Sequence, residues 1–426
     1  MIVFVRCALA GADWPTFRGS FGDGRVSGPG DTRPVGLPIT WSETENVKWK
    51  TAIHDQGWST PTILGGQIWL TTATPDGHDF FVLCLDSATG KIKFEEKLFH
   101  SDNPEPLGNA RGVNCYATPS PALEPGRAYV HFGSFGTACL DTSAFKVLWK
   151  RDDLPCRHYR GPSSSPVLFE DLLILTLDGA DKQYVAALDK QTGKTVWKTD
   201  RSVAWNDENS NDSMIKDGDR RKAHSTPILI NANGKTQLLS GGAKAAYGYD
   251  PRTGKEIWRA AYDAWSAAPL PMFDNGLAFF ATGYGTTELW AIKVDGLGDV
   301  TSSKVVWKFG SMVPKAASPV LVDGMIYLIS DDGVITCLEA STGKQVWRQR
   351  IGGKFWASPI YADGRIYFSN EQGKTTIVKA GPAFEGVATN SLTGGFMASP
   401  AVSGNALFLR TKTHLYRIES GATTSP

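Results

Sequence analysis

Apolar and polar residues alternate along this chain in short runs with a period of two. The segment 319–350 is the clearest example, with alternating runs at 319–322, 325–330, 334–338 and 345–350 separated by glycine-containing turns. This period is typical of half-buried strands, and Asp-Gly and Thr-Gly-Lys steps are typical of hairpin turns, where glycine supplies the positive φ. The segment therefore predicts one sheet of four antiparallel strands.

The same unit recurs along the chain. Each copy opens with a small or hydroxyl residue followed by proline and leads into an alternating run. The eight copies open at Ser59-Thr60-Pro61, Thr118-Pro119-Ser120-Pro121, Ser165-Pro166, Thr226-Pro227, Ala268-Pro269, Ser318-Pro319, Ser358-Pro359 and Ser399-Pro400. The tightest copies are about forty residues apart, which matches the period of propeller blades.

A second element follows about thirty residues after the first, at a spacing expected within one such repeat. It reads acidic-x-x-Thr-Gly-Lys-x-x-Trp at 189–197, 250–258 and 339–347, with degenerate copies at 86–94 and 141–149, and Trp307 ends another copy. The aromatic residue falls in the last strand of each unit. A large ring at that position can pack between neighbouring sheets and bury area that a lone sheet cannot.

The two ends of the chain predict how the ring closes. The eighth unit, from Pro400, supplies only three strands, whereas 46–50 looks like a fourth strand without a first three. We therefore expect 46–53 to pair with the strand at 415–418 and complete the last blade, which removes the seam of the ring. The prediction is an all-β, eight-bladed β-propeller of four-stranded antiparallel blades.

The propeller is predicted as a single domain over 13–420, with an N-terminal arm at 13–45 and a flexible tail at 421–426. Seven blades remain the alternative, because the unit at 359–390 lacks the Thr-Gly-Lys and Trp elements.

Composition agrees with a β-protein and narrows the partners. The 426 residues include 45 Gly and 14 Trp, and the net charge of +1 favours neither nucleic acid nor an anionic membrane. No apolar run reaches the roughly 20 residues that span a bilayer. Residues 1–12 are apolar, with alanines at 8, 10 and 12, and predict the remnant of a secretory signal peptide cleaved before Asp13. An ordinary chain terminus is the alternative; the signal predicts a periplasmic or secreted protein.

The cysteines do not form a metal-binding pattern. Cys84, Cys139 and Cys337 occupy one repeat position and are expected in the core. Cys115 and Cys156 lie in loops between blades, where they either pair as a disulfide or remain free, since sequence cannot show their geometry. No CxxC pair or Cys/His spacing indicates zinc.

The repeat elements resemble a known family. The Ser-Pro lead-in and the sequence from Ala187 to Trp197 are similar to PQQ-like propeller repeats, which occur in quinoprotein dehydrogenases and BamB-type outer-membrane assembly lipoproteins. The segment from Asp13 to Gly19 resembles the mature N-terminus of a secreted, planctomycete-type group of this superfamily, most of whose members have no assigned activity. The resemblance covers about residues 13–420. It implies the fold, and function has to be argued from the site.

Two long insertions, 99–118 and 200–226, join blades and are expected on one face, which is the predicted binding face. Residues just before the lead-ins should ring the central funnel. The candidate ligand-binding residues are His54, Trp58, Arg111, Asn114, His158, Arg160, His224, Trp265, Lys315 and Trp356, with Tyr116, Lys354 and Phe396 beside them. Basic and aromatic side chains suit an anionic or sugar-like ligand. Plugging of the channel by the same side chains is the alternative.

The resemblance also raises the question of catalysis. Many enzymatic quinoproteins hold PQQ with calcium, an adjacent cysteine pair and a Glu, Asn and Asp set. This chain has no adjacent cysteines, and no catalytic residue is assigned. The segment 207–212 begins like a calcium loop but has Asp212 at position six and Gly218 at position twelve, so it is interpreted as a solvated loop.

These observations favour an extracytoplasmic binding or scaffolding protein, with its ligand or partner on the insertion face. No cofactor is expected. A PQQ- and calcium-dependent oxidoreductase and a BamB-like assembly factor with envelope-protein partners are the alternatives.

Overall fold

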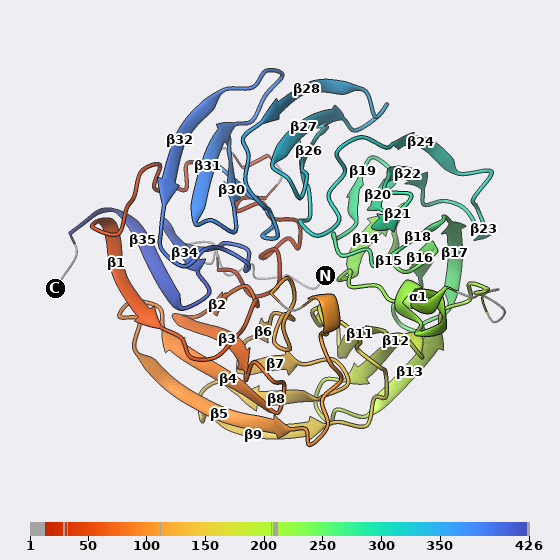
Figure 1. Ribbon diagram of the computed structural model, residues 1–426, viewed down its shortest axis with the longest axis horizontal. Helices are drawn as coiled ribbons and strands as arrows, with labels where there is room; N and C mark the ends of the chain where they lie inside the picture. Colours follow the sequence, from red (N-terminus) through yellow and green to blue (C-terminus); the bar gives the residue numbers. More distant parts are fainter. Residues whose placement is uncertain are drawn as a thin grey trace, which may run out of the picture.

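Eight four-stranded antiparallel sheets surround a central axis in the computed structural model (Figure 1). The structure describes residues 13–28, 30–31, 33–110, 112–205, 207 and 212–423. The predicted eight-bladed propeller is confirmed. The predicted signal remnant, 1–12, lies outside the described residues.

In blades 1 to 7 the four strands follow one another along the chain, and the first strand lies nearest the axis. Blade 1 comprises β2 (Thr62–Leu64), β3 (Gln67–Ala73), β4 (Asp79–Asp86) and β5 (Ile92–His100), and blade 2 comprises β6 (Ala122–Glu124), β7 (Arg127–His131), β8 (Thr137–Asp141) and β9 (Lys146–Arg151). Blade 3 comprises β10 (Val167–Phe169), β11 (Leu172–Asp178), β12 (Gln183–Asp189) and β13 (Thr195–Asp200), and blade 4 comprises β14 (Ile228–Ala232), β15 (Lys235–Gly241), β16 (Ala245–Tyr249) and β17 (Glu256–Ala261). Blade 5 comprises β19 (Met272–Asp274), β20 (Leu277–Ala281), β22 (Leu289–Lys293) and β24 (Val305–Phe309), and blade 6 comprises β25 (Val320–Val322), β26 (Met325–Ile329), β27 (Val334–Glu339) and β28 (Gln345–Arg350). Blade 7 comprises β29 (Ile360–Ala362), β30 (Arg365–Ser369), β31 (Lys374–Lys379) and β32 (Gly386–Ser391), and blade 8 comprises β33 (Ala401–Ser403), β34 (Ala406–Arg410), β35 (His414–Thr423) and β1 (Glu45–Ala52).

A few short elements lie outside this pattern. Strand β18 (Ala264–Trp265) pairs with β21 (Tyr284–Gly285), and β23 (Gly298–Asp299) adds a parallel strand to the rim of blade 4. The helical turns are η1 (Gly108–Ala110), α1 (Ser213–Lys216) and η2 (Asp219–Arg221).

The N-terminal strand closes the ring as predicted. Strand β1 pairs antiparallel with β35, with Lys50 opposite Tyr416 and Thr51 opposite Leu415. Strand β35 continues to Thr423, three residues into the segment predicted as a tail. The unit at 359–390 forms the regular sheet β29 to β32, so the seven-bladed alternative is wrong. Its strands form without the Thr-Gly-Lys turn because alternation and cross-strand pairing suffice.

Tryptophans at the rim join neighbouring blades. The indole of Trp149 in blade 2 lies against Gly193 in blade 3, where a Cβ atom would come within 2.7 Å of the ring, and its Nε1 donates to the carbonyl of Lys190 at 3.0 Å. The same contact recurs at other junctions, namely Trp49 with Gly90, Trp197 with Gly254 and Trp307 with Gly343. The Gly of each Thr-Gly-Lys turn therefore serves two needs, a positive φ and room for the tryptophan of the preceding blade.

Hydroxyl groups near the axis form a second inter-blade contact. At six junctions, the backbone N–H of the residue before the lead-in proline donates to the hydroxyl of its counterpart in the next blade, at 2.9–3.0 Å. The pairs are Thr60 to Ser120, Ser120 to Ser165, Ser165 to Thr226, Leu270 to Ser318, Ser318 to Ser358 and Ser358 to Ser399. We call Ser120, Ser165, Thr226, Ser318, Ser358 and Ser399 the hydroxyl ring.

The hydroxyl ring corrects one lead-in. The fifth copy was predicted at Ala268-Pro269, but the residue in the equivalent position is Leu270, whose amide donates to Ser318 and which is followed by Pro271 and β19. Two X-Pro dipeptides, Ala268-Pro269 and Leu270-Pro271, follow one another there, and the pattern of a small residue before proline selected the first. Because Leu270 has no hydroxyl, the ring is interrupted between blades 4 and 5.

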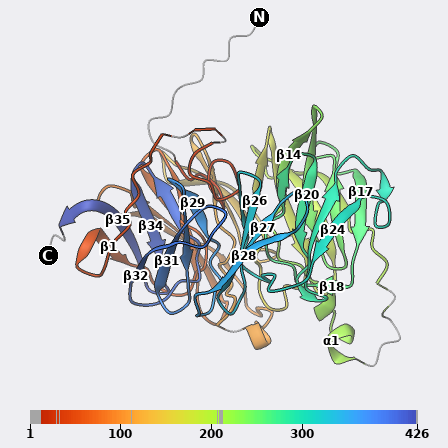
Figure 2. The same cartoon turned by 90° about the horizontal axis from the view of Figure 1, so that it is seen from above.

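The N-terminal arm crosses the face opposite the long insertions (Figure 2). In that view α1, which belongs to the insertion 200–226, and the orange segment near residue 110 lie on one face, while the red arm lies on the other. Trp14 pairs with Ile63, and the carbonyl of Pro15 accepts from Leu123. The arm places Phe17 and Arg18 on the propeller axis, next to blades 6 and 7.

Replacement of Gly193 by alanine tests the rim contact. Gly193→Ala should lower the free energy of unfolding by about 3 kcal/mol, because the residue has a φ of +71° and its Cβ would meet Trp149. Gly234→Ala is the matched control, since φ is +78° and nothing lies near the added Cβ, and should cost only about 1 kcal/mol. Equal losses in urea unfolding would show that the tryptophan contact contributes nothing there.

Candidate ligand-binding cavity

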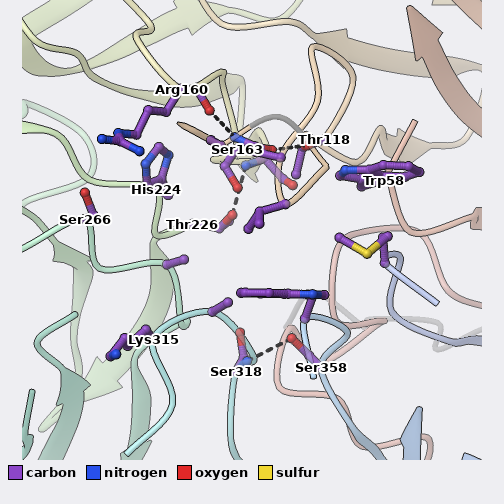
Figure 3. Close-up of a pocket in the computed structure, with 18 of the residues that line it drawn as sticks. Trp58, Thr118, Arg160, Ser163, His224, Thr226, Ser266, Lys315, Ser318 and Ser358 are labelled. Carbon is purple, nitrogen blue, oxygen red and sulfur yellow. Dashed lines mark hydrogen bonds between the residues drawn. The ribbon is translucent and has the colours of Figure 1, made fainter. Parts of the chain in front are cut away.

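A cavity of about 350 Å³ lies where the inner ends of the blades meet. Seven of the ten predicted site residues line it: Trp58, Asn114, Arg160, His224, Trp265, Lys315 and Trp356. Figure 3 labels Trp58, Arg160, His224 and Lys315 among them. They come from inter-blade connections around the ring, as the argument from the lead-ins required. Thr118, Ser163, Ser266 and five members of the hydroxyl ring supply further polar lining, and Phe17, Val113 and Met397 supply apolar lining.

Three predicted site residues are not among the lining residues. His54 follows β1 at the surface, where it contacts Asp55 at 2.8 Å and Glu95 at 3.2 Å. His158 is buried beside Cys156 and Gly133. Arg111 lies outside the described residues. The three further candidates, Tyr116, Lys354 and Phe396, are also absent from the lining; Lys354 pairs with Asp332 at the surface and the other two are buried.

A buried carboxylate fixes the insertion 200–226 against the cavity. Asp219 of η2 accepts two hydrogen bonds from Arg160, at 2.8 and 2.7 Å, and a further contact from the ammonium of Lys222. Burial favours the protonated acid, but the hydrogen bonds from Arg160 and Lys222 outweigh it and lower the pKa of Asp219. The carboxylate is therefore ionised and neutralised by its two partners, which suits a structural anchor better than a general base.

Lys315 presents a cation to the cavity. Its ammonium lies 4.9 Å from the centroid of the Tyr284 ring, and no carboxylate of the described residues lies within ion-pair distance of it. Trp58 has a buried indole N–H without a partner among those same residues, whereas the indole of Trp356 donates to Glu371 at 2.9 Å. The carboxylate of Asp331 accepts from the backbone amide of Lys315 at 3.1 Å and interacts electrostatically with Lys315 without forming an ion pair. One wall thus carries a cation without a direct ion pair, and another carries an unused donor.

Sequence reasoning missed two arginines close to the axis. Arg18 is fully buried and donates to the carbonyls of Pro359 at 2.5 Å and Pro319 at 3.2 Å. Arg410 is buried too and donates to the backbone carbonyls of Ser59 and Thr71. Burial lowers the pKa of each to about 10, so both stay protonated at neutral pH. Neither forms an ion pair within the described part of the chain.

The chain matches a family profile described as outer membrane protein assembly factor BamB over residues 181–298 and 296–383. It is also 28% identical over 204 residues to the dehydrogenase subunit of a quinone alcohol dehydrogenase from Gluconobacter oxydans (strain 621H), covering 44% of this chain, and 21% identical over 219 residues to BamB from Yersinia pestis, covering 40%. The chain spans 24% and 53% of the lengths of these two proteins.

Solved structures share the architecture. The quinohemoprotein alcohol dehydrogenase of Comamonas testosteroni superposes with a TM-score of 0.70 at 13% identity, over 97% of this chain and 82% of that one. BamB from Moraxella catarrhalis superposes with a TM-score of 0.59 at 12% identity, over 87% and 99%. The protein is a PQQ-like β-propeller. The propeller contains, within its described residues, no helix of the length and apolar character needed to cross a bilayer.

The lining of the propeller's cavity does not fit a PQQ–calcium unit. Calcium prefers six to eight oxygen ligands, with carboxylates prominent among them. Asp219 is the one carboxylate among the lining residues that the structure describes, and it is held by Arg160 and Lys222. No cluster of three metal-ligating side chains occurs in the described ranges. In the loop interpreted from sequence as solvated, Asp207 pairs with Arg221, while 208–211 lie outside the description.

The disulfide considered for the propeller is not formed. Cys115 and Cys156 are both free and buried. The Cys115 thiol lies 3.4 Å from the hydroxyl of Thr118, and that of Cys156 lies near the His158 ring. Burial raises the pKa of both thiols, so they behave as small core residues.

Buried neutral histidines make the propeller sensitive to acid. Burial lowers the pKa of His131 to about 3 and that of His158 to about 4. Both pKa values lie below the unfolded value of about 6.5, so the stabilisation is complete above that pH and declines as the pH falls toward 4. The half-buried His224 in the cavity wall has its pKa lowered to about 3, by burial and then by Lys222.

We expect His158→Gln to flatten this dependence. Between pH 7 and pH 5 the wild type should lose about 2 kcal/mol more unfolding free energy than the variant, because one fewer buried imidazole has to be protonated on unfolding. Urea unfolding at the two pH values measures the difference. The same pH dependence in the wild type and in the variant would contradict the assignment.

Proposed function

We propose that this PQQ-like propeller is an extracytoplasmic binding protein that holds a small anionic ligand in its central cavity. The observation that carries the proposal is the charge around the cavity. Lys315 lines it without a direct ion pair among the described residues, and the buried Arg18 and Arg410 lie nearby, bonded only to neutral groups.

The energetics of buried charge support an anion. Burying a cation without a counter-charge costs several kcal/mol, and hydrogen bonds to carbonyls compensate only part of this. An anion in the cavity would interact favourably with all three cations in surroundings of low dielectric constant. The tryptophans Trp58 and Trp356 offer flat apolar surface for the rest of such a ligand. A neutral sugar would use the same surface but not the charge.

The location is supported by the relatives. The matched family profile and one matched protein are named as outer membrane protein assembly factor BamB, and the apolar start of the chain predicts a signal remnant. An oxidoreductase is less well supported, because the cavity lacks the oxygen donors that calcium requires and its one carboxylate is neutralised by two cations. Dye reduction with alcohols in the presence of PQQ and calcium would favour the enzyme if turnover occurred.

Lys315→Met tests the proposal. Calorimetric titration with benzoate and with PQQ, beside glucose as a neutral probe, should show binding of at least one anion, weakened about tenfold or more in the variant. Lys308→Met is the matched control, since that ammonium also rests on an aromatic ring, Trp290 at 3.8 Å, but does not line the cavity. Binding of glucose alone, or equal effects of the two variants, would contradict an anion site.

A further inference from the structure

We infer that the hydroxyl ring is an oxyanion subsite, in which serine and threonine hydroxyls donate to the oxygens of a carboxylate, sulfate or phosphate group on the ligand. The inference rests on the proposed function and deepens it, because it names the chemical group that the cavity holds and the atoms that hold it.

The hydroxyls of the ring have hydrogen-bond donors that no group of the described residues accepts, and this leads to the subsite. A serine or threonine hydroxyl accepts hydrogen bonds and also donates one. Each ring hydroxyl accepts from a backbone amide of the preceding blade, and among the hydrogen bonds of the described residues none has a ring hydroxyl as donor. Buried polar hydrogens are normally satisfied, so these donors need an acceptor that the blades do not supply.

Position makes the unused donors convergent. Five of the six ring members line the cavity, namely Ser165, Thr226, Ser318, Ser358 and Ser399. All five are buried, with exposed fractions between 2% and 6%. They occupy the same position at the start of the innermost strand of their blades, so their side chains surround one volume, and Figure 3 shows Thr226, Ser318 and Ser358 around it. Several hydroxyl donors that face one small volume suit a ligand group whose atoms only accept hydrogen bonds.

Charge selects an anion over a neutral acceptor. The guanidinium of Arg18 binds the carbonyls of Pro319 and Pro359, the residues that directly follow Ser318 and Ser358. Arg410 bonds the backbone carbonyl and hydroxyl of Ser59, next to the blade 1 lead-in residue Thr60. Arg18 thus binds the residues next to two ring members, Arg410 binds beside Thr60, whose amide donates to the ring member Ser120, and neither arginine forms an ion pair among the described residues. Their field favours an oxyanion against the ring and disfavours an ammonium group there.

The test compares two serines that make the same inter-blade bond. Ser318→Ala removes a cavity donor and leaves the Leu270 amide without its acceptor; Ser120→Ala leaves the Thr60 amide without its acceptor, but Ser120 does not line the cavity. Both variants should lower the unfolding midpoint by similar amounts. Ser318→Thr keeps the hydroxyl, as Thr226 does in blade 4, and should retain both stability and binding.

Binding is measured by calorimetry on the full chain with sodium sulfate, sodium phosphate and sodium benzoate, each at constant ionic strength. The inference predicts that at least one of these anions binds the wild type. Its affinity for Ser318→Ala should be about tenfold weaker, and its affinity for Ser120→Ala should be within twofold of the wild-type value. The strongest probe shows whether the group is a carboxylate or a tetrahedral oxyanion.

The outcomes separate this inference from the proposed function. Equal affinity in Ser318→Ala and Ser120→Ala, with affinity lost in Lys315→Met, would overturn the oxyanion subsite and leave the anion cavity standing. Failure of the wild type to bind any of the anions, PQQ included, would overturn both.

Discussion

Contact between neighbouring blades is the constraint on which the whole structure depends. A four-stranded sheet has two faces and no interior, so each blade is stable only when its faces are covered by the next. The chain secures this contact at two radii. At the rim a tryptophan packs on a glycine in a turn of the next blade, as Trp149 does on Gly193. Near the axis a hydroxyl accepts a hydrogen bond from a backbone amide of the preceding blade, as Ser165 does from Ser120. The outer contact buries apolar area and the inner one fixes register.

The inner contact also explains why the cavity is polar. An apolar residue before each proline would leave the amide of the preceding blade without an acceptor, so a hydroxyl is needed there for stability alone. The same hydroxyl brings a spare donor to the axis, where backbone and side chains converge. A structural repeat of this kind therefore produces a ring of donors as a by-product, and Arg18 and Arg410 add charge beside it at a cost in stability. Stability is often lower than it could be where a ligand has to be held.

The sequence predicted the fold well because the fold is periodic. Eight lead-ins and the recurring Trp gave the blades, and the incomplete eighth unit gave the closing strand, which is β1 within one residue at each end. The site was predicted in part. Residues before a lead-in, such as Trp58 and Lys315, reach the cavity because every blade starts at the axis. His54 does not, because it lies only two residues after the rim strand β1, where it contacts Glu95, whereas Trp58 of the same connection lies close to the lead-in.

The two arginines that were missed share one property, which is that each side chain bonds to the backbone of a blade to which it does not belong. Arg18 comes from the arm and Arg410 from the end of β34, and nothing in the periodic pattern indicates that either side chain crosses to another blade.

The junction between blades 4 and 5 departs from the repeat and gives the cavity features that the other junctions do not supply. The hydroxyl ring is interrupted there by Leu270, the rim of blade 4 carries the extra strand β23, and Trp258 donates to Gln237 of its own blade and not to the next turn. The additional pair β18 and β21 brings Trp265 and Tyr284 to the cavity, with Tyr284 under Lys315. Next to it, Asp219 ties the insertion between blades 3 and 4 to Arg160 of the connection between blades 2 and 3. Six junctions share the amide-to-hydroxyl contact, whereas the junction between blades 4 and 5 lacks it and instead positions groups that distinguish this cavity from a plain channel.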